Sequence, residues 1–325
     1  MRKHLGATSA RLVAKIVAAC TLALLVGPAC QSGQTSSPAP QGASFPVVIH
    51  QGDGSNLTLD RQPRRIVSLS PTATEMLYAI GAGKQVVAVD DQSNYPASAP
   101  ITKLSATQPN VEAIAGYSPD LVVATEDTGG LVKGLAVLRV PTLLEKAAKD
   151  LNESYSQIRQ LGSATGHVAQ ANEVVSRMRS DVASIVASAG KNTRQLSVYH
   201  ELDDTFFSAT SRTFIGQVYV LLGLKNIADR ASGAAPDYPQ LSSEFIISSS
   251  PDLIVLADAK CCNQNLDSLG KRPGWRSIAA VKNQQVVGVD DDVASRWGPR
   301  VVDFLRQIAP RVRQLRQVGE TPRAA

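Results

Sequence analysis

The sequence predicts an α/β fold made of two lobes that are joined by one long helix. Short β-rich runs alternate with helical segments twice along the chain, and an unbroken helical pattern separates the two sets. Such alternation is typical of parallel sheets covered by helices on both faces. With 325 residues, the chain also exceeds the usual size of one domain.

Residues 1–29 have the pattern of a secretory signal peptide. A basic start without acidic residues precedes an apolar run over 16–26, which is too short to span a hydrocarbon core of ~30 Å as a helix. Removing this segment lowers the 33 basic residues to 29, against 28 acidic ones. The charge of the mature chain therefore gives no reason to expect nucleic acid as a partner.

Cys30 stands where a bacterial lipobox places its lipid-modified cysteine, although Gly27 replaces the usual Leu, Val or Ile. Residues 31–44 are rich in Ser, Gly, Gln and Pro, a composition typical of a flexible tether. We expect residues 30–44 to be a lipidated cysteine with its tether, which anchors an exported protein to the outer face of the cytoplasmic membrane. The alternative is an ordinary cleaved signal.

The first lobe is predicted over residues 45–166. It opens with a hairpin, 47–49 and 57–59, around a Gly-Asp-Gly turn. The strands that follow are expected at 66–69, 86–89, 121–124 and 142–144, with helices starting near Thr72, Val111, Gly130 and Leu151.

A helical pattern over 167–190 carries one apolar stripe and ends at Gly190, which suits a helix C-cap. A helix of this length spans roughly 36 Å, about one domain diameter. We expect it to bridge the lobes and to limit hinge closure; the alternative is a surface helix of one large domain.

The second lobe is predicted over residues 191–318, followed by a disordered tail over 319–325. Its strands are expected at 196–200, 253–257 and 286–289, and its helices from Thr213, Ser242, Gly274 and Pro299.

Two pairs of segments resemble each other within the chain. Glu112 precedes Pro119-Asp120 and an apolar run, as Glu244 precedes Pro251-Asp252 and a similar run seven residues later. Residues 85–90 and 285–290 also match. Two lobes of related design around a central ligand cleft explain these similarities.

No pattern in the sequence requires an enzyme or a metal site. The histidines are His4, His50, His167 and His200, and no two have metal-ligand spacing. Paired aspartates such as Asp203-Asp204 most often form turns or helix caps. The rival interpretation is a secreted enzyme that uses these aspartates with His200.

Ligands of open α/β sheets bind outside the carboxyl ends of the strands. The loops expected there cover 70–74, 90–95, 125–130, 201–211, 258–265 and 291–297. Aromatic and arginine side chains in and beside these loops suit a large, partly apolar ligand with acidic or amide groups. These side chains are Tyr95, Phe206, Phe207, Arg212, Arg296 and Trp297, with Gln92 beside them.

Five motifs occur in order and resemble the cobalamin and ferric-siderophore binding proteins that serve ABC importers. They are Arg65-Ile-Val-Ser-Leu-Ser-Pro-Thr-Ala-Thr-Glu75, Asn94-Tyr95-Pro96, Asn110-Val-Glu112, Tyr238-Pro-Gln-Leu-Ser-Ser-Glu244 and Arg296-Trp-Gly-Pro-Arg300. The resemblance spans residues 65–313 and implies two Rossmann-like lobes bridged by one long helix. It also implies a monomer that delivers a solute to a two-subunit membrane permease, with Glu112 and Glu244 docking against permease arginines. A sensor without transport is the alternative.

The resemblance also implies ligand contacts, and it leaves the cargo open. Phe207, Asp292 and Arg296 match corrinoid-contacting positions, whereas Gln92 and Thr125 replace a tyrosine and a tryptophan of cobalamin-binding members. A ferric siderophore or haem would instead use arginine and tyrosine. The positions expected to bind the ligand are Gln92, Tyr95, Thr125, Phe207, Arg212, Asp292, Arg296 and Trp297. No resident cofactor is expected, because the cobalt or iron belongs to the ligand.

Cys261 and Cys262 are adjacent and lie in an expected cleft-side loop. Cys20 belongs to the signal and Cys30 to the anchor, so these two thiols remain in an oxidising compartment. We expect a vicinal disulfide that stiffens the loop, although adjacent Cα atoms lie closer than the ~4.4–6.8 Å of ordinary disulfides. Two free thiols or an intermolecular bridge are the alternatives.

The disulfide can be tested by intact-mass measurement of the chain from Gln31 onward. Because a disulfide blocks both sulfurs, alkylation is expected to add no mass before reduction and two adducts after it. Two adducts without reduction would show that the thiols are free.

Overall fold

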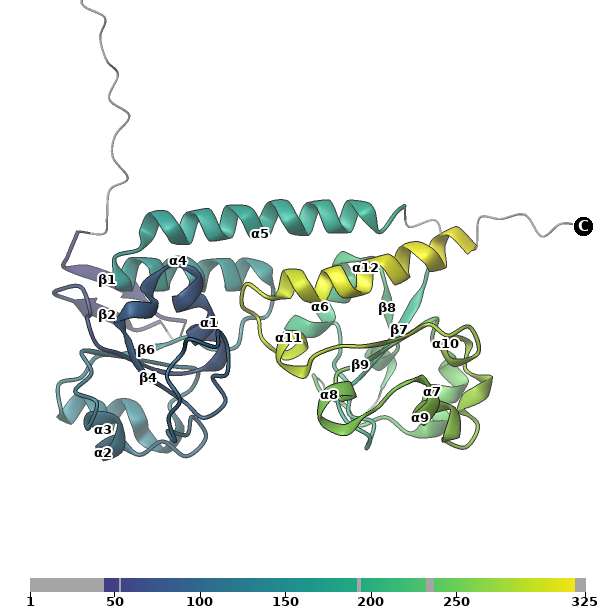
Figure 1. The fold of residues 1–325 in the computed structure, drawn as a ribbon, viewed down its shortest axis with the longest axis horizontal. Helices are drawn as coiled ribbons and strands as arrows, with labels where there is room; N and C mark the ends of the chain where they lie inside the picture. Colours follow the sequence, from purple (N-terminus) through teal and green to yellow (C-terminus); the bar gives the residue numbers. More distant parts are fainter. Residues whose placement is uncertain (1–43, 53, 192–193, 232–236, 319–325) are drawn as a thin grey trace, which may run out of the picture. The chain divides into compact units, whose positions relative to one another are not determined.

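The computed structural model describes residues 44–52, 54–191, 194–231 and 237–318 (Figure 1). The predicted signal peptide, Cys30, the tether up to residue 43 and the tail over 319–325 lie outside these residues. All of the described residues belong to one compact unit. The predicted opening hairpin is confirmed: β1 (Val47–His50) pairs antiparallel with β2 (Asn56–Leu59).

The first lobe contains a four-stranded parallel sheet with the order β4-β3-β5-β6. Its strands are β3 (Ile66–Leu69), β4 (Val86–Val89), β5 (Leu121–Ala124) and β6 (Thr142–Leu144). All residues of β3 and β5 are buried, because helices cover both faces of a parallel sheet. Its α-helices are α1 (Pro71–Ala79), α2 (Val111–Ala115), α3 (Leu131–Val137) and α4 (Leu151–Thr165), with 3₁₀ turns at Ala82–Gln85 and Thr128–Gly130.

The second lobe contains another four-stranded parallel sheet, with the order β10-β9-β7-β8. Its strands are β7 (Ser197–Glu201), β8 (Lys225–Asn226), β9 (Leu253–Leu256) and β10 (Val286–Gly288). Its helices are α6 (Phe214–Leu221), α7 (Ser243–Ser249), α8 (Ala259–Cys262), α9 (Leu266–Lys271), α10 (Ala279–Lys282), α11 (Asp291–Ser295) and α12 (Val301–Val318), with 3₁₀ turns at Ile227–Arg230 and Trp275–Ser277.

The two sheets have the same topology. Counted along the chain, both place their strands in the order second, first, third, fourth. Glu112 and Glu244 are equivalent in this topology, since each is the second residue of the helix that precedes the third strand. The match between 85–90 and 285–290 has no such basis, because β4 is the second strand of its sheet and β10 is the fourth.

The long helix α5 (Val168–Ser188) follows the first sheet and precedes the second, as predicted. Its buried stripe contains Ala171, Val174, Val175, Met178 and Val182. The helix α5 is not the single link between the sheets, because α4 and α12 pack along it (Figure 1). Gly162 of α4 permits the close approach to α5, since a Cβ atom there would collide with the Cβ of Ala171.

One hydrophobic core continues from the first sheet to the second through these helices. It contains Ile66 and Val123 of the first sheet, Val175 of α5, Ile308 of α12 and Val255 of the second sheet, all fully buried. The lobes are therefore joined by packed side chains as well as by the chain itself.

Two segments expected to be loops contain short helices, α8 within 258–265 and α11 within 291–297. The elements β8 and α9 were not predicted either. Elements of two to six residues are too short to show a hydrophobic period. Local capping defines two of them: Asp290 accepts a hydrogen bond from the Asp292 amide at the start of α11, and Asn265 accepts one from the Asp267 amide at the start of α9. In the described part of the chain, no helix is both long and apolar enough to cross a membrane.

Candidate functional site

A buried carboxylate of the first lobe holds two arginines of the second. Glu75 lies in α1 and is 3% exposed. Its Oε1 accepts a hydrogen bond from Arg296 Nη1 at 2.8 Å, and its Oε2 accepts one from Arg300 Nε at 3.0 Å. A buried charge is tolerated only when it is paired and hydrogen-bonded, and these guanidinium groups meet that requirement.

The same arginines reach the loop that follows β4. Arg296 donates to the carbonyl of Gln92 and to Oδ1 of Asn94, both at 3.0 Å, and it also pairs with Asp292. Asn94 in turn donates to Asp292 Oδ2 at 2.7 Å. The Arg300 guanidinium lies over the ring of Tyr95, 4.3 Å from its centroid. We call this set the inter-lobe network: Glu75, Gln92, Asn94, Tyr95, Asp292, Arg296 and Arg300.

The network gathers four of the eight positions expected to bind ligand. Gln92, Tyr95, Asp292 and Arg296 lie in it, and Arg296 is only 6% exposed. A ligand that used Arg296 would therefore compete with its present partners.

The other four positions lie elsewhere. Trp297 donates its indole N–H to Gln157 of α4 at 2.8 Å, so its polar edge is occupied. Arg212 pairs with Asp237 at 3.0 Å, and both side chains are exposed. Phe207 is 36% exposed beside Gln240, and Thr125 is half-buried directly after β5.

Sequence reasoning missed Glu75 and Arg300, although both end a motif that it quoted. A signal was present: Glu75 is the one charged residue of α1, between side chains that belong in a core. A charged side chain on a buried helix requires a partner of opposite charge, but the sequence does not indicate where that partner lies.

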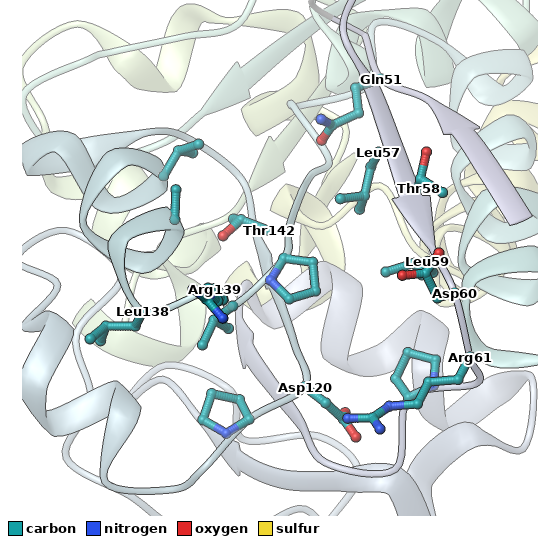
Figure 2. A pocket seen from close by; sticks show the side chains of 16 residues that line it. Gln51, Leu57, Thr58, Leu59, Asp60, Arg61, Asp120, Leu138, Arg139 and Thr142 are labelled. Carbon is teal, nitrogen blue, oxygen red and sulfur yellow. The ribbon is translucent and has the colours of Figure 1, made fainter. Parts of the chain in front are cut away.

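The first lobe borders two surface hollows, and one of them adjoins the inter-lobe network. A groove of about 490 Å³ is lined by Tyr95 together with side chains of α1, α5 and α12. A larger pocket, of about 720 Å³, lies beside the residues that precede β3, β5 and β6, at the opposite ends of those strands. Figure 2 shows Leu57, Thr58 and Leu59 on one side of that pocket and Leu138, Arg139 and Thr142 on the other. No position expected to bind ligand lines it.

Residues 66–293 match the model of the family described as "Periplasmic binding protein". The chain belongs to this family. It is 30% identical over 319 residues to an uncharacterized ABC transporter substrate-binding lipoprotein of Bacillus subtilis, covering 95% of this chain and 97% of that protein. It is 30% identical over 279 residues to a cobalamin-binding protein of Halobacterium salinarum, covering 83% and 75%.

A solved structure has the same fold. It is described as a possible iron-binding (periplasmic solute-binding) protein from Staphylococcus epidermidis, with 28% identity and a TM-score of 0.68 over 78% of this chain and 99% of that one. The protein is therefore an extracytoplasmic substrate-binding protein of an ABC transporter, with a membrane permease as its partner, and not an enzyme.

The side chains that an enzyme would use have structural roles in this binding protein. His200 is fully buried, its Nδ1 lies 2.6 Å from the Tyr219 hydroxyl, and burial lowers its pKa to about 3. Asp203 accepts hydrogen bonds from Thr205 in a turn. The carboxylates of Asp290, Asp291 and Asp292 lie close enough together to hold a cation, but Asp290 already pairs with Lys260 and Asp292 with Arg296.

Each lobe buries an acid at the carboxyl end of its sheet. Glu145 follows β6, and its buried Oε1 has no hydrogen-bond partner among the described residues; burial raises its pKa to about 8. Asp258 follows β9, and burial, followed by the charge of Glu201, raises its pKa to about 7. Glu201 itself is held by Arg272 at 2.6 Å. Cys261 and Cys262, joined by a disulfide, follow directly in α8.

Glu75→Gln is expected to lower the free energy of unfolding by about 3 kcal/mol, because it removes the buried counter-ion that Arg296 and Arg300 share and leaves Arg296 with Asp292 alone. Urea denaturation measures this loss. The matched control is Glu173→Gln, which breaks an exposed pair with Arg177 and should change stability by less than about 0.5 kcal/mol. Equal effects of the two substitutions would contradict the role assigned to Glu75.

Glu145→Gln is expected to alter the pH dependence of stability. As pH rises, the Glu145 carboxyl loses its proton near its ordinary pKa of 4.5 in the unfolded chain. In the folded protein the raised pKa keeps this proton on Glu145 until about pH 8. The wild type therefore loses stability as pH rises across that interval. Between pH 5 and pH 8, the free energy of unfolding of Glu145→Gln should rise by several kcal/mol relative to that of the wild type. Denaturation at a series of pH values measures this difference. Glu126→Gln, at an exposed glutamate of the same lobe, serves as control, and parallel profiles for Glu145→Gln and wild type would contradict the assignment.

Proposed function

We propose that this protein is a lipoprotein that captures a metal chelate outside the cytoplasmic membrane and hands it to an ABC permease. The observation that carries the proposal is the shared strand order of the two sheets. In this order the second strand lies on one side of the first and the third strand on the other, and the crevice at the carboxyl ends of the first and third strands is where α/β sheets bind ligands. Thr125 and Phe207 follow strands that border this crevice.

The names of the relatives support a chelate as cargo. One relative is named for cobalamin, and one structural neighbour is described as possibly binding iron. Phe207 has an exposed ring for stacking. The pair between Arg212 and Asp237 is exposed, and such a pair contributes little stability, so a ligand carboxylate can exchange with Asp237. We propose a corrinoid, a ferric siderophore or haem, with these side chains among its contacts.

The position of two acids supports docking to a permease. Glu112 and Glu244 are both exposed and occupy the same place in the two lobes. Asn110 and Ser242 cap the helices that carry them, by accepting hydrogen bonds from Ala113 and Phe245 amides. Two exposed carboxylates on capped helices in equivalent places suit a permease with two related subunits. The name of the Bacillus subtilis relative supports the lipid anchor on Cys30.

A titration of the chain from Gln31 onward, without the predicted signal peptide and Cys30, tests the cargo. Cyanocobalamin, haem and ferrichrome are added separately, and binding is followed by calorimetry and by the visible spectrum of the chelate. One of them is expected to bind saturably with one site per chain. Phe207→Ala should weaken that binding at least about tenfold through loss of stacking area.

Leu138→Ala is the matched control, because Leu138 is also an exposed apolar side chain but lines the pocket of Figure 2. This variant should bind as the wild type does. Absence of saturable binding to all three chelates would overturn the proposed cargo class.

A further inference from the structure

A groove of about 580 Å³ in the second lobe contains Glu244. Its walls come from the loop after β7, the first turn of α7 and the segment around α9. The lining residues are Asp204, Phe206, Ser243, Glu244, Ile247, Gln264, Ser268, Arg272, Pro273 and Trp275. We propose that this groove is a socket for a cationic side chain of the permease, in which Asp204 acts as a second docking acid beside Glu244. The proposal rests on the docking role given to Glu244 above.

The unpaired charge of the groove is negative. Asp204 and Glu244 are exposed, and within the described residues neither side chain has a hydrogen bond or an ion pair. The one cation among the lining residues, Arg272, is already neutralised: it binds both oxygens of the fully buried Glu201, at 2.6 and 2.7 Å. A partner that entered this groove would therefore meet two carboxylates without counter-ions.

The walls behind the acids are apolar and held in place. The Arg272 guanidinium lies 5.3 Å from the ring centroid of Phe206 and 4.5 Å from that of Trp275. Trp275 is fully buried and donates its indole N–H to Ser243 Oγ at 2.8 Å. Ile247 and Pro273 add aliphatic surface. Arginine and lysine combine an aliphatic stem with a charged end, so they match an apolar groove with an acidic rim.

The place of the groove in the fold favours the permease over a free solute. The groove adjoins α7, whose equivalent in the first lobe is α2 with Glu112. The permease must contact both lobes at the same time. A second acid beside Glu244 increases the electrostatic attraction that orients the permease on the protein. A small cationic solute is the other occupant that this chemistry admits.

Uptake by cells that carry full-length variants in place of the wild type tests the proposal. Radiolabelled cyanocobalamin, haem and ferrichrome are supplied separately. Asp204→Lys and Glu244→Lys are each expected to reduce uptake at least about tenfold, because each places a like charge against the cation of the permease. The matched control is Asp267→Lys, since Asp267 is an exposed acid of α9 that does not line the groove.

Chelate binding by all three variants should equal that of the wild type, which shows that they are folded. If Glu112→Lys and Glu244→Lys abolish uptake while Asp204→Lys does not, the socket is wrong and the docking proposal stands. If none of the charge reversals affects uptake, both fail. Micromolar binding of N-acetylarginine amide together with unaffected uptake by Asp204→Lys would assign the groove to a small cationic solute instead.

Discussion

The arrangement of the two lobes depends on one buried ion cluster, in which Glu75 of α1 binds Arg296 and Arg300. Removing such charges from water is costly, and the cost is offset only while all partners keep their geometry. A motion that drew α1 away from the start of α12 would leave buried charges unpaired. Because the hydrophobic core through α4, α5 and α12 joins the same parts, packing and electrostatics both oppose a wide hinge opening.

Most of the fold could be predicted because its elements carry a local signal. The strands β3 and β5 are four-residue apolar runs, as burial on both faces requires, and α5 shows one continuous stripe. The network could not be predicted in this way, since Glu75 and Arg296 are separated by 221 positions. Trp297 illustrates the same limit: its loop suggested a ligand contact, but its indole N–H is used by Gln157, 140 positions away.

The two lobes share a strand order, but the side chains that follow their strands differ in chemistry. After the fourth strand of the first sheet stands Glu145, alone and buried, whereas Asp258, after the third strand of the second sheet, shares its surroundings with Glu201 and Arg272. A sheet needs only apolar residues within its strands, so the residues after each strand are free to differ. This freedom explains why the fold could be recognised from the sequence while the cargo could not.

The proposed docking residues and the loops proposed to bind the ligand are joined through the strands between them. Ile114, two residues after Glu112, packs in one buried cluster with Val122 and Ala124 of β5, and Thr125 follows that strand directly. In the second lobe, Ile246 packs with Leu256 of β9, which leads into α8. Since close-packed interiors transmit displacement, a permease that pulled on both glutamates would move the carboxyl ends of both third strands. Docking could thus disturb the ligand crevice without a wide opening of the lobes.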